Sequence, residues 1–310
     1  MANYITIDGG TTNTRVSLVK DYEIIGTVKI SLGARSGIDS KEPLKNAIKD
    51  GIEKLLSDND LSECDITRIL AAGMITSEFG LYRADHITVP AGIGELHDTM
   101  VEVKLDEISE IPFVFIRGVK TVSDKLEETD MMRGEEAELI GIMNTDDGEC
   151  VYILPGSHSK IIIVDSKGRI TQFSTMLTGE MIASLSSGTI LKGTVDLSCD
   201  KTDDKYLIQG YKYCTERGIN EALFKVRILK NLFNCTTEEA YSFFIGVVLA
   251  DEINAVLKVK ADKVVIGGRK QIKEAMSVIL KAVSDKTVVS LSEDEVDKSS
   301  SFGMIKIYEY

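Results

Sequence analysis

Two stretches of the chain repeat the same order of strand, glycine-containing tip and strand. The expected segments are Tyr4–Asp8, Gly9-Gly10 and Arg15–Lys20 in the first stretch, and Cys150–Leu154, Pro155-Gly156 and Lys160–Asp165 in the second. A third strand follows each hairpin, at Glu23–Lys29 and at Arg169–Ser174. With Gly10 placed over Gly156, Thr11 falls on Ser157 and Asn13 on Ser159. This pattern predicts a duplicated α/β domain, the alternative being chance similarity of two hairpins.

The other segments with clear periodicity fit an α/β chain of two domains. A length of 310 residues corresponds to one large or two ordinary domains. Apolar spacing and turn residues predict helices that begin at Pro43 and span Met131–Met143, Glu216–Asn231, Thr237–Val259, Ile272–Val283 and, weakly, Gly303–Tyr310, and strands at Ile66–Ala72, Asp262–Ile266 and Thr287–Leu291. We expect a first domain over residues 1–120 and a second over 121–310.

Composition restricts the class of protein. The chain carries 49 acidic against 36 basic residues, a net charge of −13, so a surface that coats nucleic acid is not expected. A local pocket on such a body can still bind an anionic substrate. Five cysteines without a CxxC pair and only three histidines argue against a disulfide framework and against a structural zinc site. We find no signal peptide and no membrane-spanning run, so a cytoplasmic protein is expected.

The strongest local motif is the run Asp8-Gly9-Gly10-Thr11-Thr12-Asn13 at the end of the first strand. Two glycines allow the backbone to approach an anion closely, and the hydroxyl, amide and backbone groups that follow are donors for phosphate. Asp8 is a candidate for Mg²⁺, which prefers carboxylates and water. A plain Asp-Gly hairpin turn is the alternative. The chain has no GxxxxGK[ST] motif, so it is not a P-loop enzyme.

Two further glycine sites offer related chemistry. The second hairpin tip contains Gly156, Ser157, His158, Ser159 and Lys160, and we expect it to bind phosphate as well. His158 is equally well explained as a turn residue that bonds its own backbone. Gly267 and Gly268 end a strand before a helix, where ligands of doubly wound sheets bind, although a tight turn explains them too.

These motifs resemble the two phosphate motifs and the adenosine motif of the actin-like ATPase superfamily, which includes hexokinases. More specifically, the chain resembles the 2-dehydro-3-deoxygalactonokinase family in four blocks: the motif at Asp8–Asn13, Ala72–Ser77 with Val89–Gly92, Met132–Ala137, and Leu154–Lys160 with Met176–Glu180. The family usually has tryptophan after Asp8, where this chain has Gly9 and no tryptophan anywhere. The exact sugar acid therefore stays open.

The resemblance implies two actin-like (ribonuclease H-like) domains with a cleft between them, the first on the sugar-acid side and the second on the nucleotide side. It also implies ATP-dependent phosphorylation of the 6-hydroxyl of 2-dehydro-3-deoxy-D-galactonate, with ATP and Mg²⁺ as cofactors. Such a transfer depends on positioning and charge neutralisation. The expected ATP ligands are Gly9, Gly10, Thr11, Thr12, Asn13, Gly156, Ser157, His158, Ser159, Lys160, Gly267 and Gly268.

A carboxylate has to accept or align the proton of the attacking hydroxyl. The candidates for this base are Glu135, which we prefer, and Glu136, with Asp130 as the next choice. Asp8 is also a catalytic candidate, because we expect it to anchor Mg²⁺. A first-turn helix cap is the alternative for the two glutamates. For the sugar acid we expect Arg133, then Arg83, to bind the carboxylate and Thr76 and Ser77 to bind hydroxyls. For Arg83, a surface ion pair with Asp85 or Glu78 is slightly favoured.

Other functions compatible with the motifs are a kinase for another small sugar or sugar acid, a non-metabolic actin-like nucleotide-binding protein, and a phosphatase of the same fold. The expected partners are ATP and a small sugar acid, with no nucleic acid and no membrane. Whether the chain forms an oligomer stays open.

Overall fold

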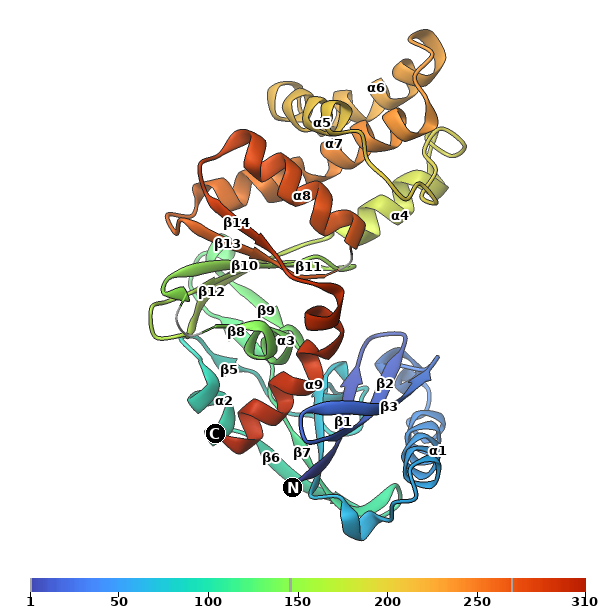
Figure 1. Ribbon diagram of the computed structural model, residues 1–310, viewed down its shortest axis with the longest axis vertical. Coiled ribbons are helices and arrows are strands. Elements are labelled where there is room, and N and C mark those ends of the chain that lie inside the picture. Colours follow the sequence, from blue (N-terminus) through green and yellow to red (C-terminus); the bar gives the residue numbers. More distant parts are fainter. Residues whose placement is uncertain (1, 145–146, 269) are drawn as a thin grey trace. The chain divides into compact units, whose positions relative to one another are not determined.

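The computed structural model describes residues 2–144, 147–268 and 270–310 (Figure 1). Contacts divide the chain into two compact units: unit 1 contains Met1–Asp146, Lys167–Gln172 and Asp294–Tyr310, and unit 2 contains Asp147–Ser166 and Phe173–Glu293. These units do not coincide with the expected segments 1–120 and 121–310. The chain returns to unit 1 at its C-terminus, so the two units are not two consecutive halves of the sequence.

Unit 1 is built on a mixed sheet of six strands in the order β3-β2-β1-β4-β7-β6. Its strands are β1 (Asn3–Gly9), β2 (Thr14–Lys20), β3 (Glu23–Ile30), β4 (Arg68–Gly73), β6 (Val101–Leu105) and β7 (Ser109–Phe115). A smaller sheet contains β5 (Ile87–Thr88), β8 (Val119–Thr121) and β9 (Asp130–Met132). The helices are α1 (Glu42–Asp58), α2 (Ile93–Asp98), α3 (Glu135–Ile142) and α9 (Glu293–Glu309), with short 3-10 helices η1 (Ala34–Ile38), η2 (Glu63–Asp65), η3 (Met74–Thr76) and η4 (Leu126–Glu128).

The local sequence explains this sheet. β2 and β3 are joined by Asp21 and Tyr22, which both have positive φ (51° and 59°), as a two-residue hairpin turn requires. β1 pairs in parallel with β4, and β4 with β7, so the carboxyl ends of three strands meet at one edge. Pro43 lies in the first turn of α1, as expected, and the apolar side of α1 packs on the sheet through Leu44, Ile48, Ile52 and Leu55.

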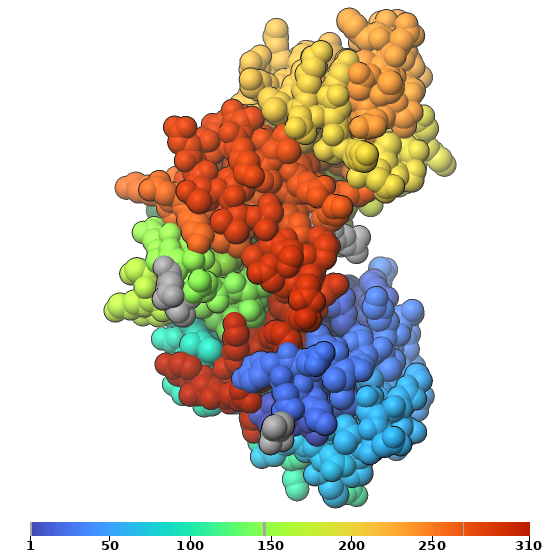
Figure 2. Space-filling model, viewed as in Figure 1, coloured from blue at the N-terminus to red at the C-terminus, as the bar shows by residue number. Residues whose placement is uncertain are grey.

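The C-terminal helix α9 belongs to unit 1 and packs against its N-terminal strands, as the dark red and blue atoms show in Figure 2. Thr6 and Ser301 share a hydrogen bond of 2.8 Å, and the Tyr4 hydroxyl donates to Glu309 at 2.9 Å. α9 also packs closely against α3, because a Cβ atom on Gly303 would lie 1.7 Å from the Ala137 carbonyl oxygen. Small residues therefore allow two backbones to touch here.

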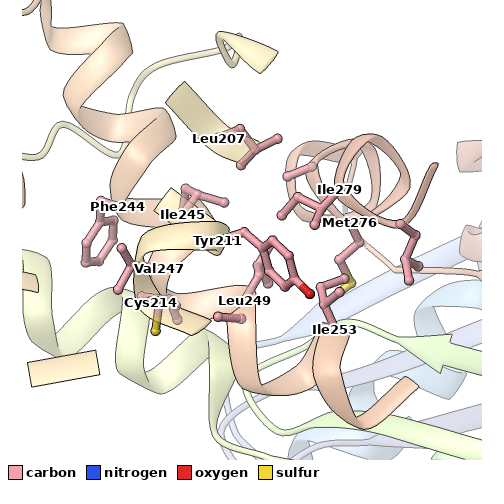
Figure 3. Close-up of a cluster of buried hydrophobic side chains, with 14 of the residues drawn as sticks. Leu207, Tyr211, Cys214, Phe244, Ile245, Val247, Leu249, Ile253, Met276 and Ile279 are labelled. Carbon is pink, nitrogen blue, oxygen red and sulfur yellow. The ribbon is translucent and has the colours of Figure 1, made fainter. Parts of the chain in front are cut away.

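Unit 2 contains a five-stranded sheet in the order β12-β11-β10-β13-β14. Its strands are β10 (Cys150–Leu154), β11 (Ser159–Val164), β12 (Ile170–Met176, which begins in unit 1), β13 (Lys263–Ile266) and β14 (Thr287–Ser290). Its helices are α4 (Thr178–Gly188), α5 (Asp204–Arg217), α6 (Ile219–Leu232), α7 (Thr237–Lys258) and α8 (Lys270–Val283). The core surrounds α7, whose Ile245, Leu249 and Ile253 lie among side chains of α5 and α8 (Figure 3).

Helix α7 is long and apolar enough to span a membrane by length and composition, so the expectation that no such segment exists is wrong by this criterion. However, 78% of its most apolar 18-residue window is buried inside the protein. Its apolar side chains pack in the core of unit 2, as those of a core helix do.

Several sequence expectations need correction. Residues 130–132 form strand β9, and the helix expected over Met131–Met143 begins only at Glu135, because Gly134 adopts φ +114°. The helix expected over Glu216–Asn231 is the end of α5 and then α6, separated by Gly218 at φ +82°. The last helix begins at Glu293 rather than Gly303, and α4 and α5 lay in a stretch where we expected no element.

The two large sheets share one topology. In each, three consecutive strands joined by hairpins precede a parallel crossover, and β3-β2-β1-β4-β7 has the same strand order as β12-β11-β10-β13-β14. The first tips differ by one residue: residues 10–13 separate the paired Gly9 and Thr14, whereas residues 155–159 separate the paired Leu154 and Lys160. The alignment that places Gly10 over Gly156 therefore cannot match both strands of the two hairpins, because one tip is longer by one residue.

Candidate active site

Three glycines bring together the strand ends and the helix start of unit 1. A Cβ atom on Gly73 would lie 2.5 Å from the Gly9 carbonyl oxygen, and one on Gly134 would lie 3.1 Å from the Gly73 Cα. Gly73 and Gly134 also have φ of +84° and +114°, which side chains rarely adopt. The end of β1, the end of β4 and the start of α3 are therefore in backbone contact at this edge.

The first candidate phosphate loop, residues 10–13, leaves β1 at this edge. The Gly10 N–H donates to the Asn13 carbonyl at 2.8 Å, and Asn13 Nδ2 donates to the Thr12 hydroxyl at 3.0 Å. Thr11, Thr12 and Asn13 are exposed. Behind them lies Gly33, where a Cβ atom would be 2.5 Å from the Gly10 oxygen and 2.6 Å from the Thr12 nitrogen. Backbone packing thus fixes the loop and leaves its outer side open to a ligand.

Backbone hydrogen bonds add to this support. The Ala34 and Arg35 N–H groups donate to the carbonyls of Gly10 and Thr11 at 3.1 and 2.9 Å. Gly33 and the start of η1 were not singled out from the sequence. The signal was weak, because a glycine after a strand indicates only a turn.

Glu135 and Glu136 begin α3 but have different surroundings. Glu136 is fully buried, and both its carboxylate oxygens accept from the Gly134 N–H, at 2.9 and 2.8 Å. Burial, with the neighbouring Glu135 charge, raises the pKa of Glu136 to about 8. Glu135 is half-buried, and one of its oxygens accepts from the Arg133 N–H at 3.1 Å. Glu136 therefore caps the start of α3, whereas Glu135 is partly accessible to a substrate.

Asp8 ends β1 beside these groups. Burial raises the pKa of Asp8, the nearby Arg15 opposes this shift, and Glu135 contributes to it. Glu135 is therefore close enough to Asp8 for the two charges to interact. Mg²⁺ in phosphoryl-transfer sites binds one or two carboxylates, water and substrate phosphates, and the Asp8 carboxylate fits that requirement. The described residues contain no cluster of three or more His, Cys, Asp or Glu side chains that would hold a metal without a substrate.

Arg133 is engaged by the loop that follows β4. Its Nη1 donates to the carbonyls of Thr76 and Ala84, at 2.8 and 2.9 Å, and to the Thr76 hydroxyl, while Nη2 lies 3.2 Å from His86 Nδ1. Burial and the Arg133 charge lower the pKa of His86 to about 4, so the ring is neutral near pH 7. In this structure Arg133 holds the loop containing Thr76. His86 was not identified from the sequence.

The remaining expected substrate ligands lie on the same segment. The Thr76 hydroxyl donates to the Gly73 carbonyl at 2.9 Å, and the Ser77 hydroxyl donates to the Met74 carbonyl at 2.7 Å. Thr76 is buried, while Ser77 is half-buried. Arg83 is exposed and lies 3.6 Å from Asp85, which is the surface ion pair considered from the sequence. Asp130, the reserve base, lies in β9, and its carboxylate accepts from the Met131 N–H at 2.7 Å.

The second candidate phosphate loop lies in unit 2, between β10 and β11. Gly156, Ser157 and His158 are exposed, whereas Ser159 and Lys160 are buried. His158 Nε2 lies 2.9 Å from a carboxylate oxygen of Glu180, and Lys160 Nζ donates to the His158 carbonyl at 3.0 Å. His158 therefore bonds a side chain of α4.

The two glycines after β13 support this loop. The Gly267 N–H donates to the Ile153 carbonyl at 2.9 Å, and a Cβ atom on Gly268, whose φ is +74°, would lie 2.5 Å from the Pro155 oxygen. Both glycines are buried. They lie beneath the second loop, at the carboxyl ends of β10 and β13, which are parallel.

The structure thus gathers Asp8, residues 9–13, Thr76, Arg133 and Glu135 at one edge of unit 1. It gathers residues 156–160 with Gly267 and Gly268 at one edge of unit 2. The buried Glu252 of α7, which hydrogen bonds to Ser159, was missed. The sequence does carry a signal for Glu252, because this carboxylate falls on the apolar side of the helix expected over Thr237–Val259.

Comparisons with known proteins identify relatives of this chain. A 2-dehydro-3-deoxygalactonokinase of Escherichia coli (strain K12) is 26% identical over 260 residues, covering 81% of this chain and 80% of the relative. A probable 2-dehydro-3-deoxygalactonokinase of Rhizobium meliloti (strain 1021) is 28% identical over 198 residues, covering 62% and 59%.

A crystal structure of a Sinorhizobium meliloti protein assigned as a 2-dehydro-3-deoxygalactonokinase shares the fold. The TM-score is 0.78 at 18% identity, with 99% of this chain and 98% of that chain covered. The model of the 2-keto-3-deoxy-galactonokinase family matches residues 8–300, a span that includes both candidate phosphate loops, Glu135 and the glycines after β13. The chain therefore belongs to the 2-keto-3-deoxy-galactonokinase family, whose members are sugar-acid kinases.

Proposed function

We propose that the protein transfers the γ-phosphoryl group of ATP to the 6-hydroxyl of 2-dehydro-3-deoxy-D-galactonate in the cytoplasm. The observation that carries this proposal is the family match over residues 8–300. Within that span, a partly accessible glutamate lies beside the aspartate that ends β1, at the edge from which a glycine loop leaves. A kinase needs these parts: phosphate donors, a carboxylate for the metal, and a carboxylate for the acceptor hydroxyl.

In the proposed reaction, Glu135 accepts or aligns the proton of the attacking hydroxyl. It suits this role better than Glu136, because both oxygens of Glu136 are bonded to the Gly134 N–H. Glu136 instead holds the start of α3, and thereby positions Glu135.

Each unit offers groups that are suited to phosphate. In unit 1, the exposed residues Thr11, Thr12 and Asn13 offer hydroxyl and amide donors suited to phosphate, and in unit 2 the exposed residues Gly156 and Ser157 offer backbone and hydroxyl donors. Asp8 is the candidate ligand of Mg²⁺, which, when bound, neutralises charge on the phosphates. Lys160 and His158 contribute to the second loop, and Gly267 and Gly268 support it from beneath, at the edge where we expect the nucleotide to bind.

For the sugar acid, the candidates are Ser77, Thr76, Arg133 and Arg83. Since Arg133 already donates to the Thr76 and Ala84 carbonyls, we propose that it acts chiefly by holding this loop. Duplicated actin-like domains, with the sugar acid bound mainly by segment 1–120 and the nucleotide by 121–310, are part of the proposal. The common strand order of the two sheets supports the duplication.

The test is ADP release with a panel of acceptors. We expect turnover with 2-dehydro-3-deoxygalactonate, and much less with its gluconate epimer and with neutral hexoses. Efficient use of a neutral hexose would contradict the substrate proposal but not the kinase activity. Phosphate release without any acceptor, at a rate equal to that with acceptor, would contradict the kinase proposal itself.

A further inference from the structure

A carboxylate is buried directly beneath the second candidate phosphate loop. Glu252, in the middle of the apolar helix α7, is only 1% exposed. One of its oxygens accepts from the Ser159 hydroxyl, and the other accepts from the Thr178 hydroxyl at 2.6 Å. These donors are 93 and 74 residues away in the sequence. A buried carboxylate is costly unless hydrogen bonds compensate for its lost hydration, so this arrangement needs an explanation.

Both donors flank the loop. Ser159 is the first residue of β11, directly after the exposed residues 156–158. Thr178 is the first residue of α4. Glu252 therefore ties the end of the loop to the start of a helix that is adjacent to it in space, through two hydrogen bonds with a charged acceptor.

The loop and the first turn of α4 also touch on their outer side. A Cβ atom on Gly179 would lie 2.4 Å from the Gly156 oxygen and 2.8 Å from the Ser157 Cα. The Glu180 N–H donates to the Ser157 carbonyl at 3.3 Å, and the Glu180 carboxylate bonds His158 at 2.9 Å. The contact is therefore held from above by Glu180 and from below by Glu252.

We propose that Glu252 is a positioning residue that fixes the second loop against α4, so that the exposed N–H groups of residues 156–158 are preorganised to bind the phosphates of ATP. The inference rests on the proposed function. Glu252 lies below the loop and bonds its hydroxyls, so it acts on the nucleotide only through Ser159 and Thr178. Preorganised donors bind an anion more tightly because no ordering has to occur on binding.

The experiment compares the binding of ATP with that of adenosine, which lacks phosphates. In Glu252→Gln, the amide oxygen can accept from only one of the two hydroxyls, so the other hydroxyl has to rotate and accept from the amide nitrogen. We expect the Kd for ATP to rise about 10-fold, as for a lost hydrogen bond to a charged group, while the Kd for adenosine changes less than about twofold. The matched control is Asp251→Asn, which removes the same charge from the exposed neighbouring residue of α7 and should bind both ligands like the wild type.

A second pair of variants covers the case in which Glu252→Gln does not fold. Thr178→Val removes one donor at constant shape and should weaken ATP binding, whereas Thr178→Ser keeps the hydroxyl and should restore it. Unchanged ATP binding in both Glu252→Gln and Thr178→Val would overturn the inference. So would an equal loss of ATP and adenosine binding, since this would show a general structural role. If the wild type itself binds ATP no better than adenosine, the proposed function fails, which is a distinct result.

Discussion

The two candidate phosphate loops occupy the same place in sheets of the same topology, but they are held differently. The loop at residues 10–13 is held by backbone: Gly33 packs against it, and the Ala34 and Arg35 N–H groups donate to its carbonyls. The loop at residues 155–159 is in backbone contact with Gly179 and Gly268, and it is held in addition by side chains, with Glu252 below it and Glu180 on its outer side.

This difference indicates which substitutions each loop tolerates. A backbone support depends on the absence of a side chain, so added volume disrupts it, while most polar substitutions nearby have little effect. A side-chain support depends on particular donors and acceptors, so isosteric changes are enough to weaken it. The chemical groups also differ, because the described carboxylate pair, Asp8 and Glu135, lies beside the first loop.

The largest expected effect separates chemistry from binding. Glu135→Gln should lower kcat by about 10²–10⁴-fold, the usual contribution of a general base, with the Kd for ATP nearly unchanged. The measurement is steady-state ADP release together with equilibrium ATP binding. Glu138→Gln, on the same helix, serves as the control and should keep its kcat. A loss of ATP affinity in Glu135→Gln with kcat preserved would assign Glu135 to the metal or to structure instead.

Gly33→Ala tests the backbone support of the first loop. The new methyl group would lie 2.5–2.6 Å from backbone atoms of residues 10–12, so either the loop or η1 has to move. We expect a loss of about 1–3 kcal/mol in the free energy of unfolding and weaker ATP binding. Denaturant unfolding and ATP titration are the measurements. Wild-type stability together with wild-type affinity would show that the loop does not depend on this contact.

Gly179→Ala tests the second loop, with Gly188→Ala on the same helix as the matched control. A Cβ atom on Gly179 meets the Gly156 oxygen at 2.4 Å, whereas one on Gly188 has no neighbour within 4 Å. The gain of about 1 kcal/mol in helix propensity from glycine to alanine partly offsets the clash at Gly179, so its loss of stability should be smaller than that of Gly33→Ala. Gly188→Ala should be neutral or stabilising. Equal behaviour of the two variants would contradict the close contact.

The last prediction concerns the pH dependence of stability. Burial raises the pKa of Glu136 from its ordinary 4.5 to about 8, so the folded protein holds this proton more tightly than the unfolded chain. The stabilisation is complete below pH 4.5 and is lost as the pH rises towards 8. Glu136→Gln removes this titration, so the free energy of unfolding of this variant should fall less between pH 4.5 and 8 than that of the wild type. If the free energy of unfolding changed with pH in the same way in both proteins, this prediction would be contradicted.

Much of the fold follows from patterns visible in the sequence. Residues 4–30 alternate and turn as a meander of strands should, and Asp21-Tyr22 is a short turn between two such strands, as the structure confirms. The apolar run in Thr237–Val259 predicted the core helix α7 almost to the residue. These segments are determined by local hydrophobic pattern, which is what a sequence shows most directly.

Other parts depend on contacts that no local pattern shows. The first half of α9 shows only weak apolar periodicity, because its packing residues are small, such as Ser299, which lies against Gly141. β9 was taken for helix because its pairing with β8 is a tertiary contact. Likewise, the supports of the two loops, Gly33 and Glu252, are remote from them in sequence, and only the folded chain brings them together.

The central claim is phosphate transfer to the terminal hydroxyl of a sugar acid, and the structure of the product tests it most directly. We predict that the product formed from ATP and 2-dehydro-3-deoxygalactonate shows, in a phosphorus–proton NMR correlation, coupling of its phosphorus to the two protons of the terminal CH₂ group. Coupling to a different carbon position, or a spectrum that contains only inorganic phosphate, would contradict the account.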